Sequence, residues 1–356
     1  MKDEKNIDIV FSMSSGDRRG AGLYYATYPL FQELNGCGYS MSLLSGQRNG
    51  NYCDDYSVWG SKQYFRSFKN LFTLKPKIIH IHGLWGWHTL YAFLLAIRSR
   101  AKIIISPHGM MDSWAMRQSR FKKILAMIFY ERLLWKRASY FHALNLDEKK
   151  SILALCPSAK VFIIPNGVDA QNKKKNFLSQ ARKKRLIFIG RLDRKKGIDQ
   201  LLSAWNKVYR ENINIELHIA GPGDEELIKM VKIAPGIKYH GALYGDDKSK
   251  FYQSADAFIL PSFSEGLPMT VLEAWSWGVP TFITRHCNLN DEIDSGLSFL
   301  IEPSQESILN AITSFGDMCL VDLQPISMRL QQHVRDHYSW PVVARMHMKY
   351  YEGEGG

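Results

Sequence analysis

The sequence predicts an α/β protein built from two domains, each with a parallel sheet. Its 356 residues correspond to two domains at the usual size of roughly 100–200 residues each. Short β-type runs alternate with helix-length segments along the chain, which is typical of sheets assembled from β-α-β units. Many strand candidates are continuous apolar runs, as expected for strands that are covered on both faces.

The strand candidates form two series, with helices between them. The first series is expected at Ile7–Phe11, Met41–Leu44, Ile78–His82, Lys102–Ser106, Tyr140–Ala143 and Val161–Ile164. The second is expected at Leu186–Ile189, Ile215–Ala220, Ile237–His240, Ala257–Leu260, Thr281–Thr284 and Phe299–Ile301. Helix-length segments include Ala21–Leu34, Arg117–Lys136, Ile198–Tyr209, Leu267–Trp277 and Trp340–Tyr351.

The segment Pro165–Lys184 separates the two series. It is polar, basic and rich in turn residues, which indicates a linker or surface loop. We therefore expect an N-terminal Rossmann-like domain over residues 1–165 and a C-terminal one over residues 166–337.

The composition excludes several classes of protein. With 46% hydrophobic and 22% charged residues, the chain is expected to fold rather than to remain disordered. Five cysteines without a C-x-x-C pair argue against a disulfide framework or a zinc knuckle and suit a reducing cytoplasm. The N-terminus does not resemble a signal peptide, and no apolar run approaches the roughly 18 residues of a membrane span.

The positive charge is concentrated in the first half of the chain. Residues 1–160 contain 23 Lys and Arg against 11 Asp and Glu, whereas residues 161–356 contain 23 of each kind. The whole excess of +12 therefore belongs to the first half. Such asymmetry suggests an anionic partner for one domain: a membrane surface, a nucleic acid or an acidic substrate.

The strongest motif is PSFSEGLPMTVLEAWSWGVP at residues 261–280. An apolar strand leads into a loop that contains Glu265, Gly266 and Leu267, and a helix carrying Glu273 follows. Free amides at the start of the helix, together with its dipole, form an anion site. The two carboxylates are placed to accept hydrogen bonds from hydroxyls on both sides of a bound diphosphate, although a helix cap and a surface acid explain the spacing equally well.

The second motif, GRLDRKKG at residues 190–197, directly follows a buried strand. Arg191 and Lys196 provide two cations at the carboxyl end of that strand, where a ligand of an open α/β sheet binds. They are suited to neutralising a diphosphate leaving group, the arginine by its fork and the lysine as a point charge. The alternative is a solvated basic turn, which is the expected role of Arg194 and Lys195.

Two further loops follow strands of the first series. SPHGMMD at residues 106–112 places His108 between a proline and a glycine, where it can point into a cleft, although a lone histidine is more often structural. SGDRRGAG at residues 15–22 looks like a phosphate-binding loop, but it is neither G-x-G-x-x-G nor a P-loop motif. His80 and His82 alternate on one strand and are expected to share a face, with too few neighbours for a metal site.

Taken together, the motifs resemble the family 4 retaining glycosyltransferases, which have the GT-B fold. The resemblance rests on the glycine loop, P-H-G, PNGVD (residues 165–169), GRLDRKKG, IAGPGDEE (residues 219–226) and SEGLPMTVLEA, and it covers nearly the whole chain. IHIHGLW (residues 79–85) and SPHGMMDSWAMRQS look like a subset that builds bacterial surface polysaccharides. The resemblance implies a C-terminal domain that binds a nucleotide-sugar and an N-terminal domain that binds the acceptor, facing across a cleft. The final helix, about residues 338–356, would pack back on the N-terminal domain.

The resemblance also implies roles for individual residues. Arg191 and Lys196 would contact the donor diphosphate, Glu265 the transferred sugar and Glu273 the ribose hydroxyls. His108 would lie beside the transferred sugar.

Backbone groups would complete the donor site. Those expected to contribute are Gly266 and Leu267, the loop glycines Gly20 and Gly22, and the amides of Cys287, Asn288 and Leu289. Arg18 and Arg19 stand where the family often has a further glycine, and Asn290 and Asp291 follow a strand where a proline before an acid is usual. These departures weaken the assignment of the two loops.

The family implies a metal-independent transfer from a UDP- or GDP-sugar with retention of anomeric configuration. Front-face attack, with the leaving phosphate accepting the acceptor's proton, is the expected route. The product would be O-antigen, capsule or exopolysaccharide, and no cofactor is expected.

Two segments of the basic half combine aromatic and basic residues. In residues 59–77, Phe65, Phe68 and Phe72 fall on one helical face, which favours contact with a membrane interface. In residues 117–137 we expect the apolar face to pack on its own sheet, because a crossover helix must cover a sheet; this face comprises Phe121, Ile124, Leu125, Ile128 and Phe129. A lipid-diphosphate-linked acceptor would explain the basic half, with the protein peripheral on the inner face of the cytoplasmic membrane.

Two other functions remain open at this point. A nucleotide-sugar epimerase on the same fold would also bind a diphosphate, but it would not need the two carboxylates around G-L-P. A nucleic-acid-binding protein would explain the charge, yet the sequence contains no recognised binding motif, and no nucleic-acid partner is expected.

Overall fold

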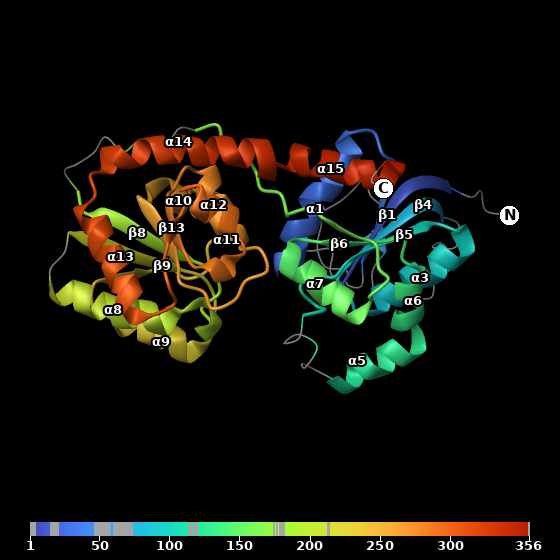
Figure 1. Cartoon of the computed structure of the whole chain (residues 1–356), viewed down its shortest axis with the longest axis horizontal. Helices are drawn as coiled ribbons and strands as arrows, with labels where there is room; N and C mark the ends of the chain where they lie inside the picture. Colours follow the sequence, from blue (N-terminus) through green and yellow to red (C-terminus); the bar gives the residue numbers. More distant parts are fainter. Residues whose placement is uncertain are drawn as a thin grey trace. The chain divides into compact units, whose positions relative to one another are not determined.

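The computed structural model describes residues 5–14, 21–45, 58–59, 74–112, 116, 120–173, 175, 177, 182–211 and 214–354. It divides into two compact units (Figure 1). The first unit comprises Met1–Gly167 and Trp340–Gly356, and the second comprises Val168–Ser339. The first unit ends at Gly167 and resumes at Trp340. The sequence predicts these boundaries at residues 165 and about 338.

The first unit contains a seven-stranded sheet in which all strand pairs are parallel. Its strands are β1 (Lys5–Met13), β2 (Met41–Ser45), β3 (Val58–Trp59), β4 (Leu74–His82), β5 (Lys102–Ser106), β6 (Tyr140–Ala143) and β7 (Val161–Ile163). The order β3-β2-β1-β4-β5-β6-β7 reverses direction between β1 and β4. Ligands of open α/β sheets bind at the carboxyl ends of the strands beside such a reversal.

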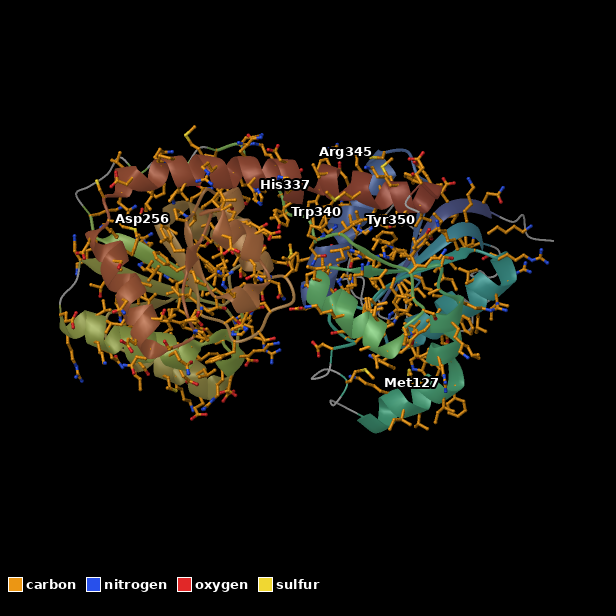
Figure 2. The ribbon with its side chains drawn as sticks, in the orientation of Figure 1. Met127, Asp256, His337, Trp340, Arg345 and Tyr350 are labelled. Atoms are coloured by element: carbon orange, nitrogen blue, oxygen red, sulfur yellow. The ribbon has the colours of Figure 1, made fainter. Side chains whose placement is uncertain are left out.

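Two apolar clusters cover opposite faces of this sheet. Ile103 and Ile105 of β5 belong to one cluster and Ile104 to the other, because successive side chains of a strand point to opposite faces. One face is covered by α1 and α15, the other by α3 and α6. Among the described residues of this unit, the helices are α1 (Ala21–Gly36), α3 (Trp87–Ser99), α5 (Arg120–Ala126), the π-helix Met127–Glu131, α6 (Arg132–Arg137), α7 (Leu146–Leu155) and α15 (Trp340–Glu352). Figure 2 labels Trp340 and Tyr350 on α15.

The second unit contains a six-stranded parallel sheet around a single apolar core. Its strands are β8 (Lys184–Ile189), β9 (Ile215–Ala220), β10 (Ile237–Tyr239), β11 (Ala257–Leu260), β12 (Thr281–Ile283) and β13 (Phe299–Leu300). The order β10-β9-β8-β11-β12-β13 reverses between β8 and β11. The α-helices are α8 (Ile198–Arg210), α9 (Glu225–Ile233), α10 (Gly245–Ser254), α11 (Met269–Ser276), α12 (Asn290–Asp294), α13 (Gln305–Asp317) and α14 (Gln324–His333).

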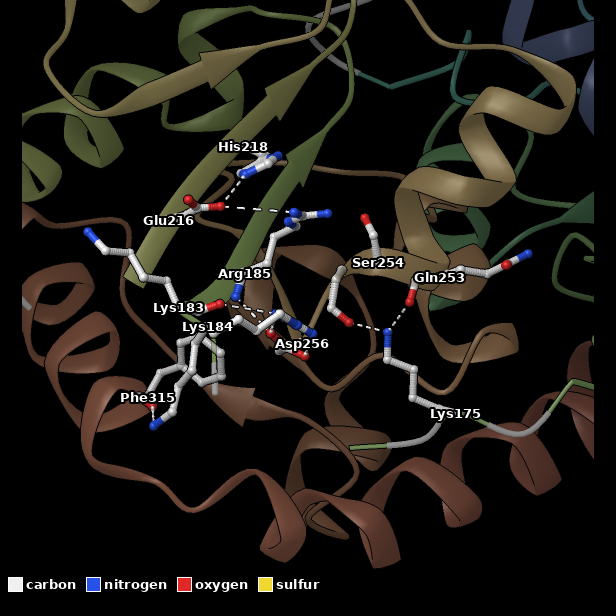
Figure 3. A network of polar contacts seen from close by, with 12 residues as sticks. Lys175, Lys183, Lys184, Arg185, Glu216, His218, Gln253, Ser254, Asp256 and Phe315 are labelled. Carbon is white, nitrogen blue, oxygen red and sulfur yellow. Dashed lines mark hydrogen bonds and ion pairs between the residues drawn. The ribbon is translucent and has the colours of Figure 1, made fainter. Parts of the chain in front are cut away.

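A polar network joins the amino ends of β8 and β11, at the edge opposite to the ligand-binding edge (Figure 3). Asp256 is buried; it accepts two hydrogen bonds from the Arg182 guanidinium, at 2.7 and 2.8 Å, and one from the Arg185 amide. The buried Lys175 ammonium donates to three main-chain carbonyls, among them that of Gln253 at 2.6 Å. Burial lowers the Lys175 pKa to about 8. The network fixes the start of the sheet and lies outside the candidate site.

Replacing Asp256 with alanine should destabilise the second unit by about 2 kcal/mol. Breaking a buried ion pair costs about 3–5 kcal/mol, and the cost is smaller here because Arg182 is partly exposed. Urea unfolding followed by hydrogen exchange in β8 and β11 would measure the loss. The exposed Asp322→Ala is the matched control; equal stability of the two variants would contradict the prediction.

The predicted fold class is confirmed: the chain is an α/β protein with two Rossmann-like parallel sheets. The cysteines in the described residues, Cys37, Cys156, Cys287 and Cys319, are free thiols. Within the same residues, each helix is too short or too polar to cross a membrane.

The prediction that residues 117–137 pack their apolar face on the sheet is wrong. Ile124, Leu125, Ile128 and Phe129 are exposed, while the opposite face turns inward with Leu134 and Trp135. The side chain of Phe121 lies outside the described residues.

The segment of residues 59–77, predicted to meet a membrane as a helix, falls mostly outside the described residues. At its ends, Trp59 belongs to β3 and residues 74–77 belong to β4. The proposed helical face of Phe65, Phe68 and Phe72 is therefore not described.

Candidate functional site

The loop after β8 brings Lys196 to the carboxyl edge of the second sheet. It forms a short 3-10 helix, Arg194–Lys196, capped by the Asp193 carboxylate. Gly197 follows with φ 73°, and a Cβ there would lie 2.0 Å from the Pro261 carbonyl oxygen. Only glycine fits this close approach, which presses the β8 loop against the loop after β11.

The loop after β11 places Glu265 directly beside Lys196. The Lys196 Nζ lies 2.6 Å from one carboxylate oxygen and 2.7 Å from the other. The Glu265 side chain is only 9% exposed and that of Lys196 22% exposed. The pair therefore lies at the point where the strand order reverses, largely shielded from solvent.

The loop after β12 fixes the position of Glu265 through its backbone. Asn288 adopts a left-handed conformation with φ 58°, and its side-chain amide donates to the carbonyls of Glu265 and Gly266, at 2.8 and 3.0 Å. The Glu265 amide donates to the His286 carbonyl at 2.9 Å. The conformation of Asn288 thus holds the exposed Gly266 in place.

Two of the three backbone amides expected to bind phosphate at this loop already donate hydrogen bonds within the protein. Those of Cys287 and Asn288 donate to the carbonyls of Thr284 and Arg285 inside a 3-10 turn. In the part of the chain that the structure describes, the Leu289 amide has no such bond. Cys287 is buried, and burial beside Glu265 raises its thiol pKa to about 12, so it remains protonated.

Glu273 has two partners that the sequence analysis did not identify. Lys248 Nζ lies 2.6 Å from one of its oxygens, and the Tyr252 hydroxyl donates to the other at 2.8 Å. Both partners come from α10. Burial and the nearby Glu273 charge raise the Tyr252 pKa well above its usual value. No side chain caps the start of α11, so the free amides expected there remain available for an anion.

Arg191 completes the group of residues at this edge. It is exposed, and within the described residues its side chain has no hydrogen bond or ion pair. Next to it, a Cβ on Gly221 would lie 1.8 Å from the Gly190 carbonyl oxygen, so the IAGPGDEE motif serves close packing between the loops after β8 and β9. An exposed cation, uncapped amides and two carboxylates together suit an anionic ligand that also carries hydroxyls.

In the first unit, His108 lies after β5 in a strained conformation. Its φ is 53°, which is rare for a residue with a side chain and is found most often at functional sites. Its Nε2 lies 3.1 Å from Nδ1 of His82, at the end of β4. The next amide, that of Gly109, donates to the buried Glu148 carboxylate at 2.6 Å. Burial, with a smaller effect of His142, lowers the His108 pKa to about 3, so the side chain is a neutral hydrogen-bonding group near pH 7.

A chain of hydrogen bonds extends behind His82 and His108. The Tyr351 hydroxyl lies 2.7 Å from His80 Nδ1, and His80 Nε2 lies 2.6 Å from the Ser106 hydroxyl. Ser106 in turn bonds to His142 at 2.7 Å. The rings of His80 and His82 are 4.1 Å apart, which confirms that they share a face. The chain connects α15 to the carboxyl ends of β4 and β5.

The two glycines of the first loop contribute no described contact. Gly20 lies outside the described residues, and Gly22 belongs to the first turn of α1, in agreement with the helix predicted over Ala21–Leu34. Leu267 lies partly buried between Glu265 and α11. In the described residues, no three His, Cys, Asp or Glu side chains are grouped as metal ligands.

Two families match the chain. The family described as "Glycosyl transferases group 1" matches residues 169–318, and the one described as "Glycosyltransferase Family 4" matches residues 48–172. The first range lies within the second unit and carries the Lys196–Glu265 pair. The second range lies mostly within the first unit.

The chain is similar to the sulfoquinovosyl transferase SQD2 of Arabidopsis thaliana, with 27% identity over 73% of this chain and 52% of that protein. It is also similar to the amylovoran biosynthesis glycosyltransferase AmsK of Erwinia amylovora, with 24% identity over 61% of this chain and 56% of that protein. It thus spans about half the length of these curated relatives. Among solved structures, HepE of Anabaena in complex with UDP and glucose shares the fold, with a TM-score of 0.76 over 97% of this chain and 99% of that chain at 13% identity.

Proposed function

Because the chain belongs to the glycosyltransferases of group 1 and family 4, we propose that it transfers a sugar from a UDP- or GDP-sugar to a saccharide acceptor. The observation that supports this best is the shielded Lys196–Glu265 pair beside Arg191, at the reversal point of the second sheet. The second unit would bind the nucleotide-sugar and the first unit the acceptor.

Each polar group at this edge fits one part of a nucleotide-sugar. Arg191 and Lys196 bind the diphosphate, helped by the amides at the start of α11 and that of Leu289. Glu265 accepts a hydrogen bond from a hydroxyl of the transferred sugar, and Glu273 accepts hydrogen bonds from the ribose hydroxyls. A carboxylate offers about four acceptor positions, so Lys248 and Tyr252 leave Glu273 capacity for the ribose.

The reaction breaks the bond between the anomeric carbon and the diphosphate oxygen and forms a bond from that carbon to the acceptor oxygen on the same face. The departing phosphate takes the proton of the acceptor hydroxyl. Negative charge therefore grows on the diphosphate, where fixed cations and amides stabilise it without reorganisation. His108 has a lowered pKa and is neutral, and we propose that it serves as a hydrogen-bonding partner of the transferred sugar. We propose that no metal ion takes part.

The acceptor is proposed to be a lipid-diphosphate-linked saccharide in the synthesis of a surface polysaccharide such as O-antigen, capsule or exopolysaccharide. The similarity to AmsK, a glycosyltransferase of amylovoran biosynthesis, supports this direction. The excess of positive charge in residues 1–160 supports an anionic membrane as the place of the reaction, at the inner face of the cytoplasmic membrane.

Nucleotide-sugars should raise the melting temperature of the protein, with one base clearly preferred. A ligand that binds only the folded state contributes about 2.7 kcal/mol at about 100 times its Kd. Screening UDP-, GDP- and other nucleotide-sugars measures this shift, which should persist in excess EDTA. Glu273→Ala should reduce it, whereas Glu211→Ala, an exposed acid of the same unit, should not.

Three results would contradict the proposal. One is the absence of stabilisation by every nucleotide-sugar, and another is a shift that EDTA abolishes. The third is conversion of the nucleotide-sugar without an acceptor, which would indicate an epimerase.

A further inference from the structure

The segment from α5 through the π-helix to α6 exposes an apolar stripe. Ile124, Leu125, Ile128, Phe129 and Leu133 are between 43% and 72% exposed. Figure 1 shows α5 at the outer edge of the first unit, and Figure 2 labels Met127 where the π-helix begins. The stripe repeats every four residues, so these side chains share one face of the helix. A contiguous apolar face of this kind on a folded protein marks an interaction site.

The opposite face of the same segment explains why the stripe points outward. Glu131 is fully buried, and its carboxylate accepts bonds from the Trp85 amide at 2.8 Å and the Trp135 indole at 3.0 Å. Thr89 donates to it as well, at 3.1 Å. Leu134 is buried beside it. The inward face is therefore anchored, and turning the stripe onto the sheet would expose these bonds to water.

A basic groove lies next to the stripe. It has a volume of about 1120 Å³ and is bordered by Ile128 of the stripe. Its cations and large aromatic side chains are Lys102, Arg132, Lys136, Lys160, Trp135 and Tyr140. Among the described residues that line it, none is acidic. Arg132, Lys136 and Lys160 are exposed, and within the described part of the chain their side chains have no acidic partner.

We propose that this surface docks on an anionic lipid bilayer. The stripe enters the interface between headgroups and acyl chains, and the groove takes the phosphate of an anionic lipid. An amphipathic helix that lies in the interface combines these two features, apolar insertion and attraction between cations and lipid phosphates. This surface would be the place where the protein contacts the membrane. The inference rests on the proposed function only for the reason why the protein would bind a membrane.

The charges favour a bilayer over a second copy of the chain. In a symmetric dimer each residue near the axis meets its own equivalent, so Arg132 and Lys136 would face the same cations of the other copy. Like charges across an interface cost free energy. An anionic lipid surface instead neutralises them.

Vesicle flotation with the full chain tests the proposal without donor or acceptor. Vesicles of phosphatidylcholine and phosphatidylglycerol in equal parts are compared with vesicles of phosphatidylcholine alone. We expect binding to the anionic vesicles that weakens as salt is raised. Phe129→Glu and Ile128→Glu should each weaken it about tenfold, because each removes a large apolar side chain from the interface.

Charge reversal supplies the second set of variants. Arg132→Glu and Lys136→Glu should each reduce binding to anionic vesicles about fivefold or more. The matched controls are Ile233→Glu, at an 81% exposed position of the second unit, and Lys207→Glu on α8. All these positions are exposed, so unchanged melting temperatures will show that the variants fold.

Several outcomes would overturn the proposal. One is equal binding to the two kinds of vesicle, and another is an equal loss of binding in the controls. A third is a protein that ignores vesicles but forms a dimer that Phe129→Glu separates. If vesicle binding behaves as expected and nucleotide-sugars fail to stabilise the protein, the docking surface stands and the proposed transferase function fails.

Discussion

Replacing Lys196 with alanine should lower turnover by about 100-fold or more while the protein remains folded. Loss of one preorganised donor to a developing negative charge typically costs about 10²–10³ in kcat. Lys196 lies 2.6 Å from Glu265 in a largely shielded position, where an electrostatic interaction is stronger than in water. The measurement is kcat and KM for the donor and acceptor that the nucleotide-sugar screen establishes. Lys195→Ala, in the same 3-10 turn, is the control and should keep near-normal turnover.

A double variant separates two explanations for the loss. If Lys196 serves mainly to neutralise Glu265, then Glu265→Gln should restore part of the activity of Lys196→Ala. If Lys196 stabilises the departing diphosphate, no restoration occurs, and the two losses combine. We expect the second result, with kcat reduced more than the affinity for the donor. Near-normal turnover of Lys196→Ala would remove the lysine from the mechanism.

Apart from β3, which the sequence analysis did not predict, the strands could be predicted from the sequence because buried parallel strands have no polar face. β5 is an example: its three isoleucines alternate between two apolar clusters, so neither side of the strand requires a polar residue. The loops at the carboxyl ends could be identified for the same reason, since they follow the apolar runs directly. Lys196 and Glu265 are far apart in the sequence, yet each follows a strand next to the reversal in strand order.

The partners of the site residues could not be predicted in the same way. Lys248 and Tyr252 reach Glu273 from α10, and the side of α10 that faces α11 depends on tertiary packing. The left-handed conformation of Asn288 follows from its bonds to the Glu265 loop, which a local sequence pattern does not contain.

The orientation of the segment 117–137 was predicted wrongly for a related reason. Apolar periodicity is the same for a stripe that faces inward and for one that faces outward. The deciding residue is Glu131, because a glutamate is usually exposed, whereas this one is fully buried among three hydrogen-bond donors.

Acidification from pH 7 to pH 5 should destabilise the first unit by about 4 kcal/mol or more. Burial lowers the pKa of His88 and of His142 to about 4 each, against 6.5 for an ordinary histidine. In the unfolded chain both bind a proton as the pH falls below 6.5, whereas in the folded unit they stay neutral until about pH 4. The unfolded state therefore holds more protons over this window, and stability falls with pH.

The size of the effect follows from the two pKa values. One pKa unit corresponds to about 1.4 kcal/mol, so at pH 5 each of these histidines contributes about 2 kcal/mol. His80, His82 and His347 are also buried, with their pKa values lowered well below 6.5, and they add in the same direction. Two groups oppose them: burial raises the pKa of Glu131 and of Glu148, and a carboxyl group with a raised pKa gains relative stability as pH falls. The histidines outnumber these carboxyls, so the net effect keeps its sign.

Hydrogen exchange measured separately in the two sheets would check this prediction. Amides of β4 and β5 should lose protection between pH 6.5 and 4, and the slope of the unfolding free energy at pH 5 should correspond to an uptake of about two protons or more. In the second unit, burial lowers the pKa values of His218 and His240, so a smaller effect is expected in β8 and β9. A first unit whose protection, corrected for intrinsic exchange, stays constant down to pH 5 would mean that these histidines can take up protons without unfolding. The hydrogen-bond chain behind His108 would then adapt to charge instead of requiring neutral rings, and the proposed role of His108 as a neutral hydrogen-bonding partner would lose its physical basis.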